Sequence, residues 1–141
     1  MNKEELAKAA AAAMWENDKA ARALGMSLDE VTLGYARLSV KVTQSMVNGH
    51  DITHGGYIFM LADTAFAFAC NSHNQNAVAQ HCAITYVAPG NLGDTMIAEA
   101  KERYQVGRSG IYDVTVRNQD GEVLAEFRGN SRTIKGVHVE V

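Results

Sequence analysis

The sequence is poor in several features that would mark a class of protein. It has only two cysteines, Cys70 and Cys82, both in apolar runs, which favours small buried thiols in a reducing compartment over a disulfide scaffold. Its formal net charge is only −3, which argues against a general binder of nucleic acid or of an acidic membrane. No basic-then-apolar leader opens the chain. We therefore expect a cytoplasmic protein with no nucleic-acid and no membrane partner.

The chain also has no low-complexity linker, no internal repeat and no internal boundary in composition. Its 141 residues suffice for one domain with a real core and are too few for two. We predict a single domain over residues 1–141, with an alanine-rich N-terminal helix over 1–24 and a flexible tail over 135–141.

The longest apolar stretch begins after His54 and predicts a helix over about residues 55–71 that is apolar on every side. Such a helix is buried all round. This one is short for a membrane span and carries a charge, Asp63, in its middle, which favours the centre of a protein fold. A carboxylate in a buried helix is costly unless it is paired, so Asp63 is a candidate for chemistry.

Gly55 and Gly56 open this helix and leave unobstructed N–H groups at its N-terminus, a place that favours negative charge. The rise from Gly55 to Asp63 is roughly 12 Å at about 1.5 Å per residue. A reacting carbonyl must lie about 3 Å from its oxyanion donors and close to its base or nucleophile. One helix cannot meet both demands, but two antiparallel copies can. The geometry therefore predicts a dimer with shared sites.

The other segments read as strands separated by turns. Turn signals such as Asp120-Gly121 join several of them, which makes neighbouring strands antiparallel. We predict an α+β fold in which an antiparallel sheet of five or six strands wraps around the buried helix, with outer edges that invite a second copy. The expected strands are residues 26–31, 35–42, 77–88, 94–105, 111–117 and 122–134.

Three motifs carry a family resemblance: Asn48-Gly49-His50, His54-Gly55-Gly56 and the run from Leu61 to Ala67. Together they resemble the signature of hot-dog-fold acyl-CoA thioesterases, and they are most similar to the phenylacetate-degradation (PaaI-like) branch. The resemblance extends over about residues 14–132. It implies a hot-dog fold and hydrolysis of aryl-acetyl (phenylacetyl, hydroxyphenylacetyl) or similar medium-sized acyl-CoA, in aromatic catabolism. It also implies homodimers that pair into tetramers, and no cofactor, since coenzyme A is part of the substrate.

The resemblance also assigns roles to single residues. Asp63 matches the catalytic carboxylate, as a nucleophile or as a general base on water. Gly55 matches the residue whose N–H holds the thioester oxygen, a role that suits a helix N-terminus. Asn48 matches a residue near that carbonyl or the water, although Asn-Gly is also a common turn pair. His54 would orient the site or polarise the carbonyl.

The expected substrate-binding residues lie in two places. Gly56 and Thr64 belong to the buried helix, and Arg108, Ser109 and Gly110 form a turn that could approach a phosphate of coenzyme A. Some relatives place a serine or threonine on the strand after the buried helix to hold the water. This chain has none at the start of that strand, so either Thr64 or Gln80 holds the water, or Asp63 works without that help.

Three alternatives stay open at this stage. A hydroxyacyl thioester dehydratase on the same fold could use His54 and Asp63, and a non-catalytic acyl-CoA sensor would need the glycines but not the carboxylate. A metal site built from His50, His54 and a cysteine has no matching ligand spacing, so we expect no metal.

Overall fold

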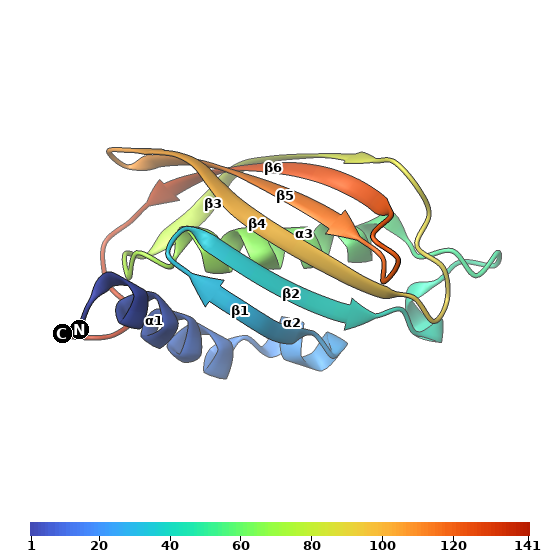
Figure 1. Cartoon of the computed structure of the whole chain (residues 1–141), viewed down its shortest axis with the longest axis horizontal. Coiled ribbons are helices and arrows are strands. Elements are labelled where there is room, and N and C mark those ends of the chain that lie inside the picture. Colours follow the sequence, from blue (N-terminus) through green and yellow to red (C-terminus); the bar gives the residue numbers. More distant parts are fainter.

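The computed structural model describes residues 1–141 and shows one antiparallel sheet curved around a central helix, α3 (Gly55–Cys70) (Figure 1). The six strands lie in the order β1-β2-β4-β5-β6-β3. The predicted fold class is therefore confirmed, with six strands. Their bounds are β1 (Ser27–Thr32), β2 (Tyr35–Lys41), β3 (Ala77–Tyr86), β4 (Thr95–Val106), β5 (Ser109–Arg117) and β6 (Val123–Thr133).

The helix α3 is long and apolar because the sheet covers most of its circumference. Leu61, Ala65 and Phe66 are buried among inward-facing residues of β2, β4 and β5. The stripe that contains Gly56, Met60 and Asp63 is more open than this buried face. The helix is apolar on every side, as predicted, apart from Asp63. One of its faces is nevertheless left uncovered by the sheet of its own chain.

The N-terminal segment, predicted as one helix, forms two: α1 (Lys3–Asn17) and α2 (Lys19–Leu24). Asp18 causes the break, because its side chain accepts a hydrogen bond from the N–H of Ala21 at 3.0 Å and so caps a new helix. The segment ends at residue 24, as expected, because Gly25 terminates α2 in the left-handed conformation, at φ 87°. The helix α1 packs beside β1 and covers that edge of the sheet (Figure 1).

The opposite edge of the sheet, β3, carries no such cover. Most of its residues are exposed, including Val78 at 46% and Tyr86 at 49%. Only one of its sides pairs with a strand, β6, and Gln80 sits in a bulge of that pairing. A long, apolar, half-paired edge of this kind is unusual in a protein that works as a monomer.

Two further segments frame the ends of α3. A short 3₁₀ helix, η1 (Gln44–Met46), and the loop after it project from the fold before Gly55 (Figure 1). At the other end the C-terminal tail, expected to be flexible, contacts the residues after α3, where Asn74 accepts hydrogen bonds from the N–H groups of His138 and Val139, both at 3.0 Å. No helix has both the length and the apolar character to cross a membrane.

Candidate active site

The start of α3 presents free backbone donors. Neither Gly55 nor Gly56 gives its N–H to an acceptor in the chain, and the side chain of His54 does not cap the helix. The N–H of His54 donates to the carbonyl of Met46 at 2.9 Å, which anchors the chain directly before the helix. Unpaired N–H groups at a helix N-terminus carry partial positive charge, so this end of α3 suits a carbonyl oxygen that gains negative charge.

Gly55 is held in place by a residue that the sequence analysis did not single out. The hydroxyl of Tyr86 donates to the carbonyl of Gly55 at 3.0 Å. A Cβ at Gly55 would lie 2.9 Å from a carbon of the Tyr86 ring, closer than unbonded carbons pack. At Gly56 a Cβ would meet nothing within 4 Å. The two glycines therefore differ: only Gly55 is required by close packing.

Asp63 lies two turns further along α3, in the middle of the helix and on its more open stripe. No cationic side chain pairs with it, and its one polar neighbour is the thiol of Cys82, 4.0 Å from sulfur to carboxylate oxygen. Burial raises the pKa of Asp63 above its ordinary value, with no opposing cation. A half-buried carboxylate of this kind is a better proton acceptor than an exposed one.

Both cysteines stand near this carboxylate as free thiols. Burial raises the pKa of Cys70 to about 12, with smaller contributions from Asp63 and Cys82. Burial, followed by the charge of Asp63, also raises the pKa of Cys82. Neither sulfur is therefore an activated nucleophile at neutral pH. No group of three His, Cys, Asp or Glu side chains is placed to hold a metal ion.

The hydroxyl of Thr64 and the amide of Asn48 are both engaged locally. Thr64 donates to the carbonyl of Met60 at 2.7 Å, one turn back in the helix. Asn48 is exposed, and its side-chain oxygen accepts from the N–H groups of His50 at 2.9 Å and Ile52 at 3.3 Å. The turn role of Asn48 is thus present in the single chain, while its side-chain NH₂ has no acceptor there.

The turn with Arg108, Ser109 and Gly110 lies at the opposite end of the fold. Arg108 donates to the carbonyl of Thr133 at 3.2 Å from one guanidinium nitrogen. A cavity of about 310 Å³ near this turn is lined by Gly107, directly before Arg108, and by Cys70, the last residue of α3. Within one chain, the structure does not bring this turn to Gly55.

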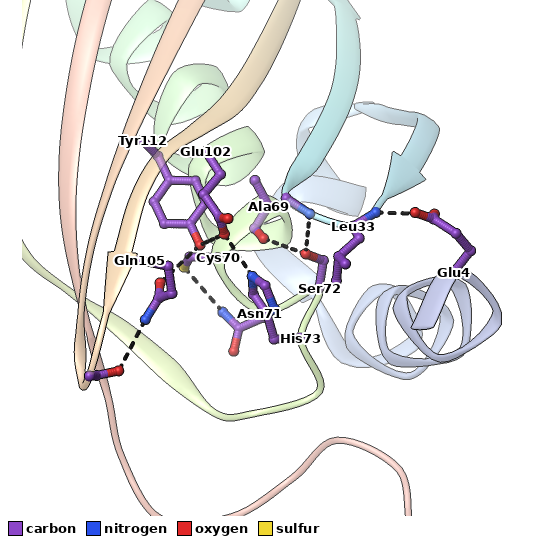
Figure 2. A network of polar contacts seen from close by, with 12 residues as sticks. Glu4, Leu33, Ala69, Cys70, Asn71, Ser72, His73, Glu102, Gln105 and Tyr112 are labelled. Carbon is purple, nitrogen blue, oxygen red and sulfur yellow. Dashed lines mark hydrogen bonds and ion pairs between the residues drawn. The ribbon is translucent and has the colours of Figure 1, made fainter. Parts of the chain in front are cut away.

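A second polar cluster occupies this same end of α3 (Figure 2). Glu102 of β4 receives the hydroxyl of the fully buried Tyr112 at 2.7 Å and lies 2.6 Å from Nε2 of His73. Burial opposes ionisation of Glu102, but the hydrogen bonds with His73 and Tyr112 outweigh it and lower its pKa. The hydroxyl of Tyr112 also lies 3.2 Å from Oε1 of Gln105, so the cluster ties β4, β5 and the residues after α3 together, and we assign it to stability.

The single chain therefore holds two separate halves of a site. The free N–H of Gly55 and the carboxylate of Asp63 occur on the same helix, separated by a rise of about 12 Å. Sequence reasoning found both but missed Tyr86 and Cys82. Nothing local could have revealed them, because Tyr86 is 31 residues from Gly55 and Cys82 is 19 residues from Asp63.

Comparison with known protein families and relatives identifies the family of the chain. A model of the thioesterase superfamily matches residues 50–125. The acyl-coenzyme A thioesterase PaaI of Escherichia coli K12 is 47% identical over 124 residues, which are 88% of this chain and 89% of that one. A putative esterase of Archaeoglobus fulgidus is 36% identical over 116 residues, covering 82% of this chain and 75% of that one.

Solved structures agree with this placement. The E. coli PaaI protein from the phenylacetic acid degradation operon superposes with a TM-score of 0.94 at 44% identity, over 96% of this chain and 99% of that one. A Streptococcus mutans protein bound to acetyl CoA superposes with a TM-score of 0.77 at 25% identity, over 80% of this chain and 91% of that one. The chain thus belongs to the thioesterase superfamily, as a hot-dog-fold acyl-CoA thioesterase of the PaaI-like branch.

Proposed function

We propose that this protein hydrolyses the thioester of aryl-acetyl or similar medium-sized acyl-CoA, phenylacetyl- and hydroxyphenylacetyl-CoA among them, and that it serves aromatic catabolism in the cytoplasm. The observation that carries the proposal is Asp63, a half-buried carboxylate with a raised pKa and no cation, on the helix that begins with the free N–H of Gly55. The names of the E. coli relative support the substrate class, since they refer to acyl-coenzyme A and to phenylacetic acid degradation.

The reaction follows from these two groups. The thioester oxygen accepts the N–H of Gly55, which stabilises negative charge as the carbonyl carbon is attacked. Asp63 either removes a proton from a water, whose oxygen then attacks, or attacks the carbon itself to give a mixed anhydride that water later opens. In both routes the C–S bond breaks, the sulfur leaves with the electron pair and is protonated, and the products are a carboxylic acid and free CoA thiol.

The two groups meet only if two chains combine. We propose a homodimer formed through the uncovered β3 edge, with antiparallel α3 helices that place Gly55 of one protomer beside Asp63 of its partner. The exposed apolar residues Val78 and Val87, which are 46% and 60% exposed, support this edge as the contact. Dimers of this kind would pair further into tetramers, as the family resemblance implies.

Asn48 fits a role in the same composite site. Its side-chain oxygen shapes the projecting loop, while its NH₂ remains available to donate to the thioester oxygen or to the water. His54 is exposed beside the helix start, where it can contact the substrate. Gly56 and Thr64 line the open stripe of α3. Arg108, Ser109 and Gly110 would serve a CoA phosphate only across a subunit contact.

The activity is tested by following free-thiol release from phenylacetyl-, hydroxyphenylacetyl-, benzoyl-, hexanoyl- and palmitoyl-CoA. We expect the aryl-acetyl members to be cleaved best. Hydration of an enoyl-CoA without thiol release would instead identify a dehydratase. Binding of acyl-CoA with no turnover of any member would identify a sensor.

The shared site is tested by mixing two inactive variants. Asp63→Asn removes the carboxylate, and Gly55→Pro removes the oxyanion donor. Proline is compatible with the first position of a helix, and His54 before it already has the extended conformation that proline requires, at φ −58° and ψ 137°. Gly55→Ala is the matched control, because its Cβ meets Tyr86 in the same way but the N–H remains.

Each of these two variants alone should lose most of its turnover, while random reassortment after mixing should restore about a quarter of wild-type activity, since each mixed dimer regains one intact site of two. No recovery on mixing, with subunit exchange verified, would place the whole site within one chain.

A further inference from the structure

A cavity of about 500 Å³ lies directly beside the proposed oxyanion donor, and its lining includes Gly55 itself. This volume is within the range of small-molecule sites. The other walls come from the segment before α3, from its first turn and from the end of β3 with the residues that follow. They are predominantly apolar and include Ile52, Ile58, Val87, Ala88 and Pro89.

No charged side chain lines this cavity. An acyl group with a terminal carboxylate would lose its hydration there and find no cation in return, which is unfavourable. An uncharged aromatic or aliphatic group would instead gain by burial, by about 25 cal/mol per Å² of apolar surface removed from water. The chemistry of the walls thus selects for uncharged, apolar acyl groups.

Tyr86 connects the cavity to Gly55, the proposed oxyanion donor. Its ring is one wall of the cavity and lies against the Cα of Gly55, so that no Cβ could fit between them. Its hydroxyl donates to the carbonyl of Gly55 at 3.0 Å, which fixes the first turn of α3 relative to β3. A thioester whose oxygen binds the N–H of Gly55 is therefore held by the same residue that this ring contacts.

We infer that this cavity receives the acyl group of the substrate and that Tyr86 is the residue that determines its size and aromatic character, while its hydroxyl positions Gly55. The inference rests on the proposed thioesterase function and specifies its substrate site. A planar acyl group can pack against the phenol ring in an offset or edge-to-face arrangement, which adds affinity beyond the area buried.

Two substitutions separate the roles of the ring and of the hydroxyl. Tyr86→Phe keeps the wall and removes the donor, so it should lower kcat by a similar factor for every acyl-CoA, acetyl-CoA included, and leave the order of preference unchanged. Tyr86→Ala removes the wall as well. It should additionally raise KM for phenylacetyl-CoA about tenfold more than KM for acetyl-CoA, whose acyl group is too short to depend on the ring. Wild type should cleave succinyl-CoA poorly.

The control is Tyr104→Ala on β4, a tyrosine 60% exposed and without a side-chain hydrogen bond. It should change none of these values. If Tyr86→Ala instead raises KM by the same factor for every acyl-CoA and the oligomer dissociates, the inference is overturned. The ring would then be assigned to a contact with a second copy.

A binding measurement keeps the inference testable without turnover. Calorimetric titration with the uncleavable thioether analogue of phenylacetyl-CoA, and with CoA alone, gives the affinity that the acyl group adds. We expect this increment to fall about tenfold in Tyr86→Ala. If the increment is unchanged, the acyl group binds elsewhere, whatever the enzyme hydrolyses. If wild type binds the analogue but releases thiol from no substrate, the proposed function fails while the cavity assignment stands.

Discussion

Replacing Asp63 with asparagine should abolish turnover and, at the same time, stabilise the fold at neutral pH. The swap keeps the size of the side chain and removes its charge. If Asp63 acts as general base, loss of that role costs typically 10²–10⁴-fold in rate. The opposite sign on stability arises because burial without a cation raises the pKa of Asp63, so the folded state holds an ionised group in an unfavourable environment.

The expected size of the stabilisation follows from linkage. A folded-state pKa above the unfolded value means that the folded state binds the proton more tightly, so stability falls as pH rises through the folded pKa. Each tenfold difference in proton affinity corresponds to about 1.4 kcal/mol. Because Asp63 still reaches solvent on the open stripe of α3, we expect a smaller gain for Asp63→Asn, about 0.5–1 kcal/mol at pH 7, that vanishes below the unfolded pKa near 4.

Asp113 offers a control with the opposite sign. The guanidinium of Arg128 donates to it at 2.6 and 2.8 Å, and this hydrogen bonding lowers the pKa of Asp113. A lowered folded-state pKa contributes stability that is present above the unfolded pKa and lost as pH falls through the folded one. Asp113→Asn should therefore be less stable than wild type at pH 7, with a difference that shrinks in acid.

The assay is urea denaturation of wild type and both variants from pH 3 to pH 8, with thiol release measured in parallel. If Asp63→Asn is inactive and is also less stable than wild type at every pH, the reasoning is refuted. That result would mean that the carboxylate is satisfied in the folded state and has a structural role.

Three other outcomes are expected. Tyr112→Phe should lower the free energy of unfolding by about 1.5–3 kcal/mol in urea denaturation, because the buried hydroxyl donates to the ionised Glu102. A change below about 0.5 kcal/mol would show that this hydrogen bond does not contribute to stability. Gly129→Ala should cost about 1–3 kcal/mol in the same assay, since its Cβ would lie 2.8 Å from the ring of Phe66, and Phe66→Leu in the same chain should recover part of the loss. Asn48→Asp keeps both loop hydrogen bonds but loses the NH₂ donor, so kcat should fall with an unchanged melting temperature, and full activity would leave Asn48 as a turn residue only.

The architecture could be predicted from sequence largely because its strongest signals are local. The apolar run after His54 predicts α3 to within one residue, and the strand expected over 35–42 matches β2 to within one residue. The break of the first helix at Asp18 was missed, because an aspartate inside an alanine-rich helix is compatible with continuation until its side chain is seen to cap Ala21. The hydrogen bonds that hold the tail depend on Asn74, more than sixty residues away, and no local pattern reports them.

The residues of the candidate site also differ in whether a local pattern in the sequence reveals them. Asp63 and Gly55 stand out in the sequence because a charge in an apolar helix and a Gly-Gly pair at its start are both local exceptions. Tyr86 does not stand out, because a tyrosine in a strand is ordinary and only the fold places it against Gly55. The assignment of Arg108 to substrate binding came from its charge and its place in a turn. The structure places it at the other end of the sheet, where one chain cannot bring it to Gly55.

The separation of Gly55 and Asp63 along one helix determines which helix N-terminus can act on the carboxylate. The positive field at a helix N-terminus lowers the pKa of a carboxylate in its first turn, which would make the carboxylate a weaker base. Asp63 lies two turns away, where this field has decayed and burial alone sets the direction of its pKa. In the proposed dimer Asp63 instead lies beside the N-terminus of the partner's α3, whose field favours the ionised carboxylate that either route of the reaction requires. Because Gly55 and Asp63 of one chain lie about 12 Å apart, the same arrangement leaves each chain without a complete site. An exposed, half-paired β3 edge next to this incomplete site is what a chain that depends on a second copy for catalysis would be expected to have.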